Sequence, residues 1–155
     1  MNKFYLTTIA ALVLIIAAGA YKFMIQGSVE KSQDGRLALQ LDAEERDLIL
    51  AEMRAFLESV QQITEAITEK DMEGIAEQAK KVGRAAQGEV PGSLMGKLPL
   101  EFKKLGFDTH SRFDQLALDA EQLGDEQHSL TQLSVLMKNC VACHAVYRIE
   151  VTDRH

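Results

Sequence analysis

The stretch LTQLSVLMKNCVACHAVY, residues 130–147, decides the fold because it repeats with a helical period. Steps of three and four residues separate the members of this repeat, which are Leu130, Leu133, Met137, Cys140, His144 and Tyr147. Such spacing is typical of a helix that packs one face against other helices. We therefore expect a helix over about residues 126–150, with its cysteines on the buried face of a helical bundle.

Inside this stretch, Cys140-Val141-Ala142-Cys143-His144 has the Cys-x-x-Cys-His spacing of covalent haem c attachment. Positions i, i+3 and i+4 share one helix face, so two thiols and one imidazole can reach the same macrocycle. The chain has only these 2 cysteines, which excludes a zinc or iron–sulfur site made of four thiolates.

Two other interpretations of the cysteine pair stay open at this point. One is a thioredoxin-like redox motif, which needs a βαβ context that the sequence does not indicate. The other is an ordinary disulfide. We favour haem because the thiol pair, the adjacent histidine, the helical setting and an export segment coincide.

Composition favours an all-α protein and disfavours nucleic acid as a partner. The 155 residues include no Trp and only 2 Pro, and they are rich in the good helix formers Ala, Leu, Glu and Gln. The formal net charge is −6, whereas nucleic-acid-binding surfaces are basic. An acidic surface instead suits a basic or locally basic redox partner protein.

Residues 1–25 form an apolar segment that is either a membrane anchor or a signal peptide. The run Phe4–Ile25 contains 22 residues, which as a helix measure ~33 Å and can cross a hydrocarbon core of ~30 Å. Ala18-Gly19-Ala20 also fits a signal-peptide cleavage site. We favour the uncleaved anchor because the apolar run continues beyond that site. Both interpretations export the domain to the periplasmic side of the bacterial inner membrane, anchored there or soluble after cleavage.

The remainder of the chain divides into three parts. Residues 26–41 are predicted to be a flexible polar tether, and residues 151–155 a short C-terminal tail. Residues 42–150 are predicted to be the functional domain, an antiparallel four-helix bundle. Its first helix starts at Asp42 with a capping pattern and continues through a regular seam of Ile49, Met53, Phe56, Val60, Ile63 and Ile67. Residues 88–106 are expected to connect the second and third helices, and Asp108 to begin the third.

The pattern Cys140-x-x-Cys143-His144-x-x-Tyr147-Arg148 on the last helix of a four-helix bundle resembles the class II cytochromes c. The resemblance covers roughly residues 42–150, and class I cytochromes c carry the motif near the N-terminus instead. It implies thioether bonds from Cys140 and Cys143 to one haem c and a proximal iron bond from His144. It also implies that Arg148 offsets propionate or iron charge; the alternative is a solvent-facing cation near a helix C-terminus.

The sixth iron ligand separates the two branches of that family. In low-spin members a methionine of the first helix binds the iron, and in cytochromes c′ the position is open. Met53 matches the methionine of the low-spin members, although a methionine on a bundle seam is also a flexible core filler. His110, Met95 and an open site are the alternatives.

The resulting functional hypothesis is a monohaem electron-transfer protein and not an enzyme. Its expected partners are redox proteins and, through the N-terminal helix, the membrane; a homodimer and a larger membrane complex stay open. A gas-binding protein of the cytochrome c′ type and a haem subunit of a larger membrane complex are the alternative functions.

Overall fold

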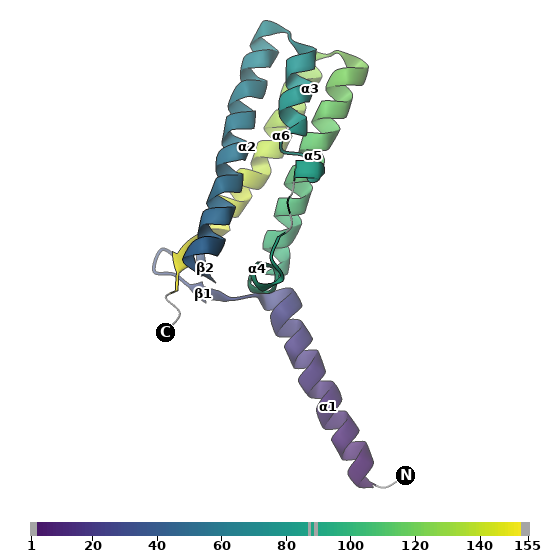
Figure 1. Ribbon diagram of the computed structural model, residues 1–155, viewed down its shortest axis with the longest axis vertical. Coiled ribbons are helices and arrows are strands. Elements are labelled where there is room, and N and C mark those ends of the chain that lie inside the picture. Colours follow the sequence, from purple (N-terminus) through teal and green to yellow (C-terminus); the bar gives the residue numbers. More distant parts are fainter. Residues whose placement is uncertain (1–2, 87, 89, 153–155) are drawn as a thin grey trace.

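The computed structural model describes residues 3–86, 88 and 90–152. The chain is mostly helical and begins with an apolar helix, as the sequence predicts (Figure 1). Helix α1 (Lys3–Tyr21) continues into a π-helical turn, η1 (Lys22–Gln26), and projects away from the rest of the molecule. Within the segment Lys3–Gln26, the most apolar window of 18 residues has a mean hydropathy of 2.1, and no residue of that window is buried in the molecule. The segment is long and apolar enough to span a membrane, a property that signal sequences share.

Four helices make the body of the molecule. They are α2 (Ala43–Glu69), α3 (Met72–Lys80), α5 (Leu100–Leu123) and α6 (Glu126–Val146). The 3-10 turn η2 (Arg84–Ala86) and the short helix α4 (Gly92–Lys97) lie between α3 and α5. The third helix of the body thus starts eight residues before Asp108, directly after Pro99, whose φ of −62° is already helical.

The ends of these helices are set by local side chains. Asp42 accepts a hydrogen bond from the Glu45 amide at 2.9 Å, and the Glu45 carboxylate accepts one from the Asp42 amide at 3.2 Å. This capping box satisfies two amides that α2 leaves without a helical partner. Asp71 and Asp125 cap α3 and α6 in the same way through their carboxylates.

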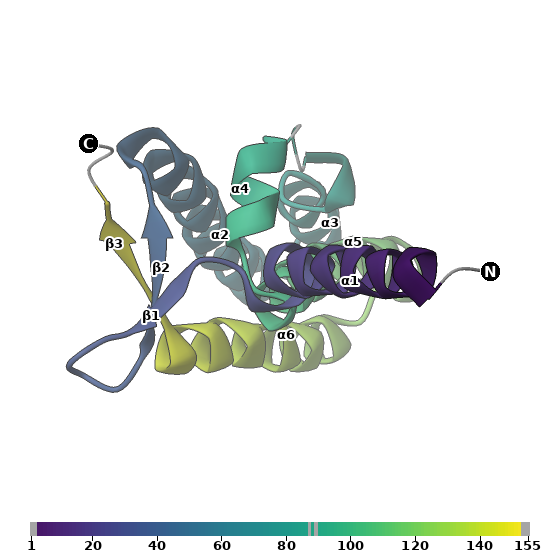
Figure 2. The ribbon, with the colours of Figure 1, turned by 90° about the horizontal axis from the view of Figure 1, so that it is seen from below.

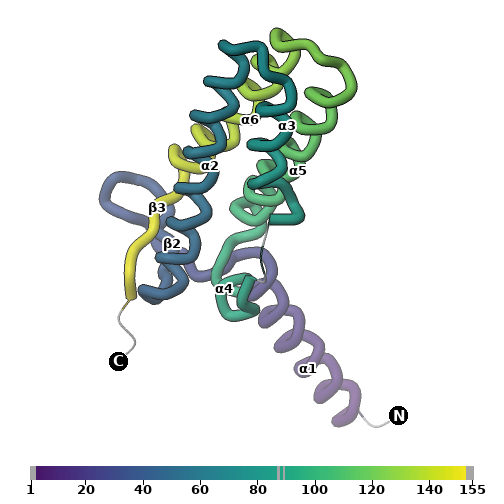
Figure 3. Tube along the Cα trace, turned by 45° about the horizontal axis from the view of Figure 1, so that its top comes forward, coloured from purple at the N-terminus to yellow at the C-terminus, as the bar shows by residue number. Residues whose placement is uncertain are grey.

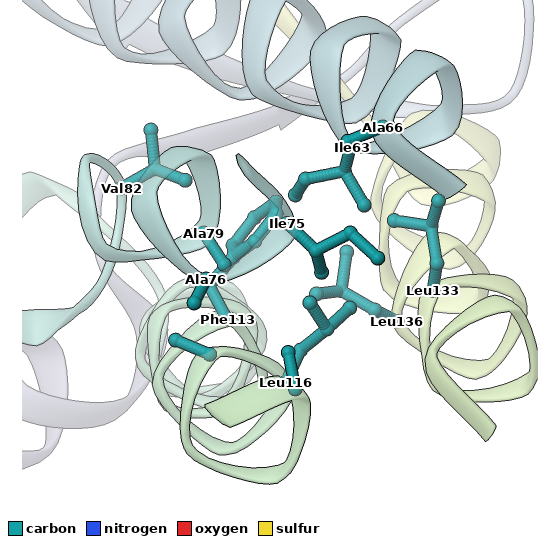
Figure 4. Packing of buried hydrophobic residues seen from close by; sticks show 12 residues of the cluster. Ile63, Ala66, Ile75, Ala76, Ala79, Val82, Phe113, Leu116, Leu133 and Leu136 are labelled. Atoms are coloured by element: carbon teal, nitrogen blue, oxygen red, sulfur yellow. The ribbon is translucent and has the colours of Figure 1, made fainter. Parts of the chain in front are cut away.

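One hydrophobic core joins the four helices. Figure 4 shows side chains from all of them pointing toward one another, among them Ile63 of α2, Ile75 of α3, Phe113 of α5 and Leu136 of α6. These four side chains are fully buried, and Phe56 stacks on Phe113 with ring centres 5.5 Å apart. Burial of such apolar surface is the main source of stability in a domain of this size.

A three-stranded sheet closes one end of the body and was not predicted. Strands β1 (Val29–Lys31) and β2 (Leu37–Leu41) pair antiparallel, and β2 pairs parallel with β3 (Tyr147–Val151). The prediction of a flexible tether over residues 26–41 is therefore wrong, since Leu39 and Leu41 are fully buried. Figure 2 views the molecule from below and shows the sheet beside the end of α6.

The same sheet corrects the predicted C-terminal end of the last helix. Helix α6 ends at Val146, because Tyr147 takes an extended conformation and pairs opposite Leu37. Val151 also belongs to β3, not to the predicted tail 151–155, whose last three residues lie outside the described part of the chain.

Candidate functional site

A cleft of about 290 Å³ lies between the first part of α2, the C-terminal end of α6 and the sheet. Four of the five predicted site residues line it: Met53, Cys143, His144 and Arg148. The structure thus brings together residues that are up to 95 positions apart in the chain. Cys140 is half-buried on α6, one turn before Cys143, and is not part of the cleft lining.

The face of α6 that carries the motif is only partly covered. The fully buried residues of α6 are Ser129, Leu133 and Leu136, whereas Cys140 and Cys143 are half-buried and His144 is exposed. The prediction that the motif lies on the buried stripe is therefore wrong in this structure. Two features explain this exposure. The side chains of an ideal helix drift around its axis relative to a 3.5-residue repeat. In addition, α2 and α6 contact each other less than the other adjacent helix pairs do.

The two thiols are free and have raised pKa values. Burial raises the pKa of Cys140, and burial together with the neighbouring Cys140 thiol raises the pKa of Cys143 to about 11. Reactive redox cysteines show the opposite shift, because an electropositive setting stabilises their thiolates. These thiols are protonated at neutral pH, which disfavours the thioredoxin-like interpretation, and the structure contains no disulfide between them.

The imidazole of His144 has no hydrogen-bond partner among the described residues, so its ring nitrogens are available to a ligand. Its backbone carbonyl, by contrast, is held in place: Arg36 Nη1 donates to it at 3.4 Å and to the Tyr147 carbonyl at 3.5 Å. A cation at the last carbonyls of a helix is favourable because the helix dipole is negative there. Arg36 therefore fixes the end of α6 that carries the motif.

Met53 is half-buried on α2 and packs with Cys143 against one apolar cluster. The buried members of that cluster are Leu39, Leu41, Ile49, Leu94, Leu98 and Tyr147. Phe102 completes the floor of the cleft and meets Tyr147 edge to face, with ring centres 5.3 Å apart. A thioether from α2 and an imidazole from α6 thus border one apolar cleft.

Three guanidinium groups line the cleft although the chain is acidic. They belong to Arg36, Arg46 and Arg148. Arg148 donates to Ser32 Oγ at 3.1 Å and lies 3.4 Å from both Asp34 and Glu150. These ion pairs are partly exposed, and exposed pairs contribute little to stability. The arginines can therefore turn toward an anionic group bound in the cleft.

Arg36 and Arg46 were missed in the sequence. A local signal for the first of them exists: Asp34-Gly35 is a common hairpin turn dipeptide, and Gly35 adopts a φ of 86° between β1 and β2. That turn places Arg36 at the cleft. Arg46 carries no such signal, because a cation in the first turns of a helix is usually a solvated residue.

His110 and Met95, the alternative iron ligands, lie in a different cavity. This second cavity, of about 120 Å³, is bordered by α2, α4 and α5. His110 is buried there, with Nδ1 2.8 Å from the Val82 carbonyl and Nε2 3.0 Å from Glu52 Oε1. Both ring nitrogens are therefore engaged, and the structure does not bring His110 or Met95 to the motif.

The donor set of the cleft suits a macrocycle better than a bare metal ion. The described residues contain no group of three or more His, Cys, Asp or Glu side chains that could hold a metal. A haem needs only one or two axial protein ligands because the porphyrin supplies the other four. One imidazole, one thioether and two nearby thiols meet that requirement.

Comparisons of the chain with protein-family models, with curated proteins and with solved structures give no match. The chemistry is therefore inferred from the motif and the cleft.

Proposed function

We propose that this chain is a monohaem c-type cytochrome that carries electrons on the periplasmic side of the bacterial inner membrane. The observation that carries the proposal is the cleft shared by Met53 of α2 and by Cys143 and His144 of α6. The proposal includes a class II architecture, an antiparallel four-helix bundle with its attachment motif on the last helix. The added sheet and the N-terminal helix distinguish the chain from that pattern.

The residues in and beside the cleft would hold haem c by covalent bonds to the porphyrin and by contacts to the iron and the propionates. The thiols of Cys140 and Cys143 would hold the macrocycle through two thioether bonds, each formed by adding S–H across one vinyl group. His144 and Met53 would hold the iron through an imidazole nitrogen and a thioether sulfur, and Arg148 with Arg36 and Arg46 would pair with propionates through charge-assisted hydrogen bonds.

Haem c supplies an iron that gains and loses one electron. The chain would contribute two ligating side chains, His144 and Met53, and an apolar lining that includes Leu39, Phe102 and Tyr147. His/Met ligation raises the reduction potential of a c-type haem. With both positions filled there is no open coordination site for a substrate, which favours electron transfer over catalysis.

Covalent attachment is the decisive test. The full chain, expressed with a haem c maturation system, is denatured and extracted with acidified acetone. We expect the haem colour to stay with the wild-type polypeptide. Cys143→Ser should retain less haem, because only one thioether is left, and Cys140→Ser,Cys143→Ser should retain none. Ser134→Ala, on an exposed part of the same helix, is the matched control. Release of all haem from the wild type would overturn the proposal.

A further inference from the structure

Several specific contacts join the end of α1 to the body of the molecule, although the side chains of residues 22–26 are exposed. The aromatic ring of Phe23 lies against Gly96 of α4, so closely that a Cβ at position 96 would collide with the ring. Only glycine leaves room for that contact. Figure 3 shows α1 leaving the molecule directly beside α4.

Lys103 joins three elements at the same place. Its Nζ donates to the Met24 carbonyl and to the Met95 carbonyl, each at 3.2 Å. The first acceptor belongs to the end of the N-terminal helix, the second to α4, and Lys103 itself to α5. A cation at the carbonyl end of a helix is stabilising because of the helix dipole.

Gly27 and Ser28, which follow the helical turn η1, continue the contacts from the end of the N-terminal helix to the sheet. Gly27 has a φ of 67°, and a Cβ there would lie 2.7 Å from Pro99 N and 2.8 Å from the Leu98 carbonyl carbon. The Ser28 amide donates to the Lys97 carbonyl at 2.7 Å, and the Ser28 carbonyl accepts from the Gln40 amide of β2 at 2.9 Å. Residues 22–28 are therefore built into the body of the molecule.

The residues that line the cleft belong to the first part of α2, the C-terminal end of α6 and the sheet. Figure 1 shows these parts at the end of the body from which α1 emerges. Measured along α2 from its first residue, Met53 lies at a rise of ~15 Å, whereas the last residue of the helix lies at ~39 Å. With α1 in a bilayer, the cleft is held in the half of the body that is nearer to the membrane. A large soluble protein would meet the bilayer as it approached that end.

We infer that residues 22–28 are a rigid mount that keeps the cleft beside the bilayer, and that the redox partner is an integral protein of the same membrane. A flexible tether would let the cleft turn toward a soluble partner, but a fixed mount restricts encounters to lateral diffusion in the membrane. The mount itself follows from the contacts above; the partner class rests on the proposed electron-transfer function.

Amide hydrogen exchange of the full chain in lipid nanodiscs tests the mount without reference to haem. We expect the Ser28 amide to exchange at least about tenfold more slowly than in an unstructured peptide, because its hydrogen bond must open first. Gly96→Leu, which expels the Phe23 ring, should abolish this protection while amides of α6 keep theirs. Gly92→Leu, at an open position of the same short helix, is the matched control. Unprotected Ser28 in the wild type would overturn the mount.

Electron exchange tests the partner class. A flexible Gly/Ser insert of about twelve residues between Gln26 and Gly27 lowers the effective concentration of the cleft at the membrane surface. It also removes the fixed orientation of the cleft relative to the bilayer. We expect reduction by respiring native membrane vesicles to slow about tenfold, and reduction by ascorbate to stay unchanged. Equal rates with vesicles before and after the insertion, or faster reduction by a soluble fraction of the same cells, would overturn the partner class. If the chain never carries covalent haem, the proposed function is wrong, but slow hydrogen exchange at the Ser28 amide would still support the rigid mount.

Discussion

Under the proposed function, the reactivity of the cleft depends on Met53, because it is the methionine that lines the cleft with His144 in the part of the chain that the structure describes. We expect the loaded wild type to be low-spin, with the weak red charge-transfer band of iron–methionine ligation. Met53→Leu keeps the side-chain volume, so it should cost less than about 1.5 kcal/mol of stability, yet it should convert the haem to high spin and admit carbon monoxide rapidly. Absorption spectroscopy and stopped-flow mixing check both effects.

The matched control is Met95→Leu in the second cavity, which should leave the spectrum unchanged. If Met95→Leu alters the spectrum and Met53→Leu does not, the ligand has been misidentified. A wild type that is already high-spin would favour the gas-binding alternative.

His110, which lies outside the cleft, should make the stability of the folded protein depend on pH. Burial lowers the pKa of its ring, but hydrogen bonds to Glu52 and to the Val82 carbonyl outweigh burial and leave the pKa raised above 6.5. A raised folded-state pKa adds stability that is fully present below the unfolded-state value and is lost as the pH rises through the folded-state value.

We therefore expect Glu52→Gln to reduce the free energy of unfolding more at about pH 6 than at about pH 9, near and above the ordinary histidine pKa of ~6.5. Urea unfolding at the two pH values measures the difference, with Glu58→Gln on the exposed face of the same helix as the control. If the loss of stability caused by Glu52→Gln grew with pH, the folded protein would prefer the neutral imidazole ring of His110.

At the level of elements, the start of α2 matters because it sets the position of Met53 and of Arg46. We expect Asp42→Ala to lower the free energy of unfolding by about 1 kcal/mol, since it removes the side chain that caps the Glu45 amide. Lys97 also lies 3.4 Å from the Asp42 carboxylate, so the short helix α4 should loosen with it. Urea unfolding is the measurement. Glu44→Ala, exposed in the same turn, should cost clearly less; equal losses would mean that the cap is not the cause.

The helices could be predicted because their signals are local. The seam from Ile49 to Ile67 and the capping pair Asp42 and Glu45 lie within one stretch of chain, and the structure has them in α2. The proximity of Met53 to His144 was also expected, but only through the resemblance, since spacing along one helix says nothing about its neighbours.

The sheet could not be predicted in the same way. Leu37 and Tyr147, which pair in it, are 110 residues apart. A mostly apolar segment of five residues such as Leu37–Leu41 is too short to distinguish a buried strand from other structure. The start of α5 was missed because Gly106 suggested a break, whereas a single glycine within a helix is tolerated at a cost of about 1 kcal/mol.

For the whole molecule, we expect the intact chain to stay in the membrane fraction. Leu14→Lys, at the middle of the apolar helix, adds about 2.5–3.5 kcal/mol to the cost of insertion and should move the protein toward the soluble fraction. Leu14→Ala is the control. Fractionation with intact-mass analysis checks this, and a native soluble chain that begins at Tyr21 would show that α1 is only a signal peptide.

The parallel pairing of β2 with β3 also fixes the order in which the molecule is completed. The strand that closes the sheet follows its partner by 110 residues in the chain, so it is synthesised well after that partner. Contacts between residues so distant in sequence form late in folding. The stretch from Cys140 to His144 comes shortly before that strand, so a growing chain contains both thiols and the imidazole before the sheet can cover the end of α6.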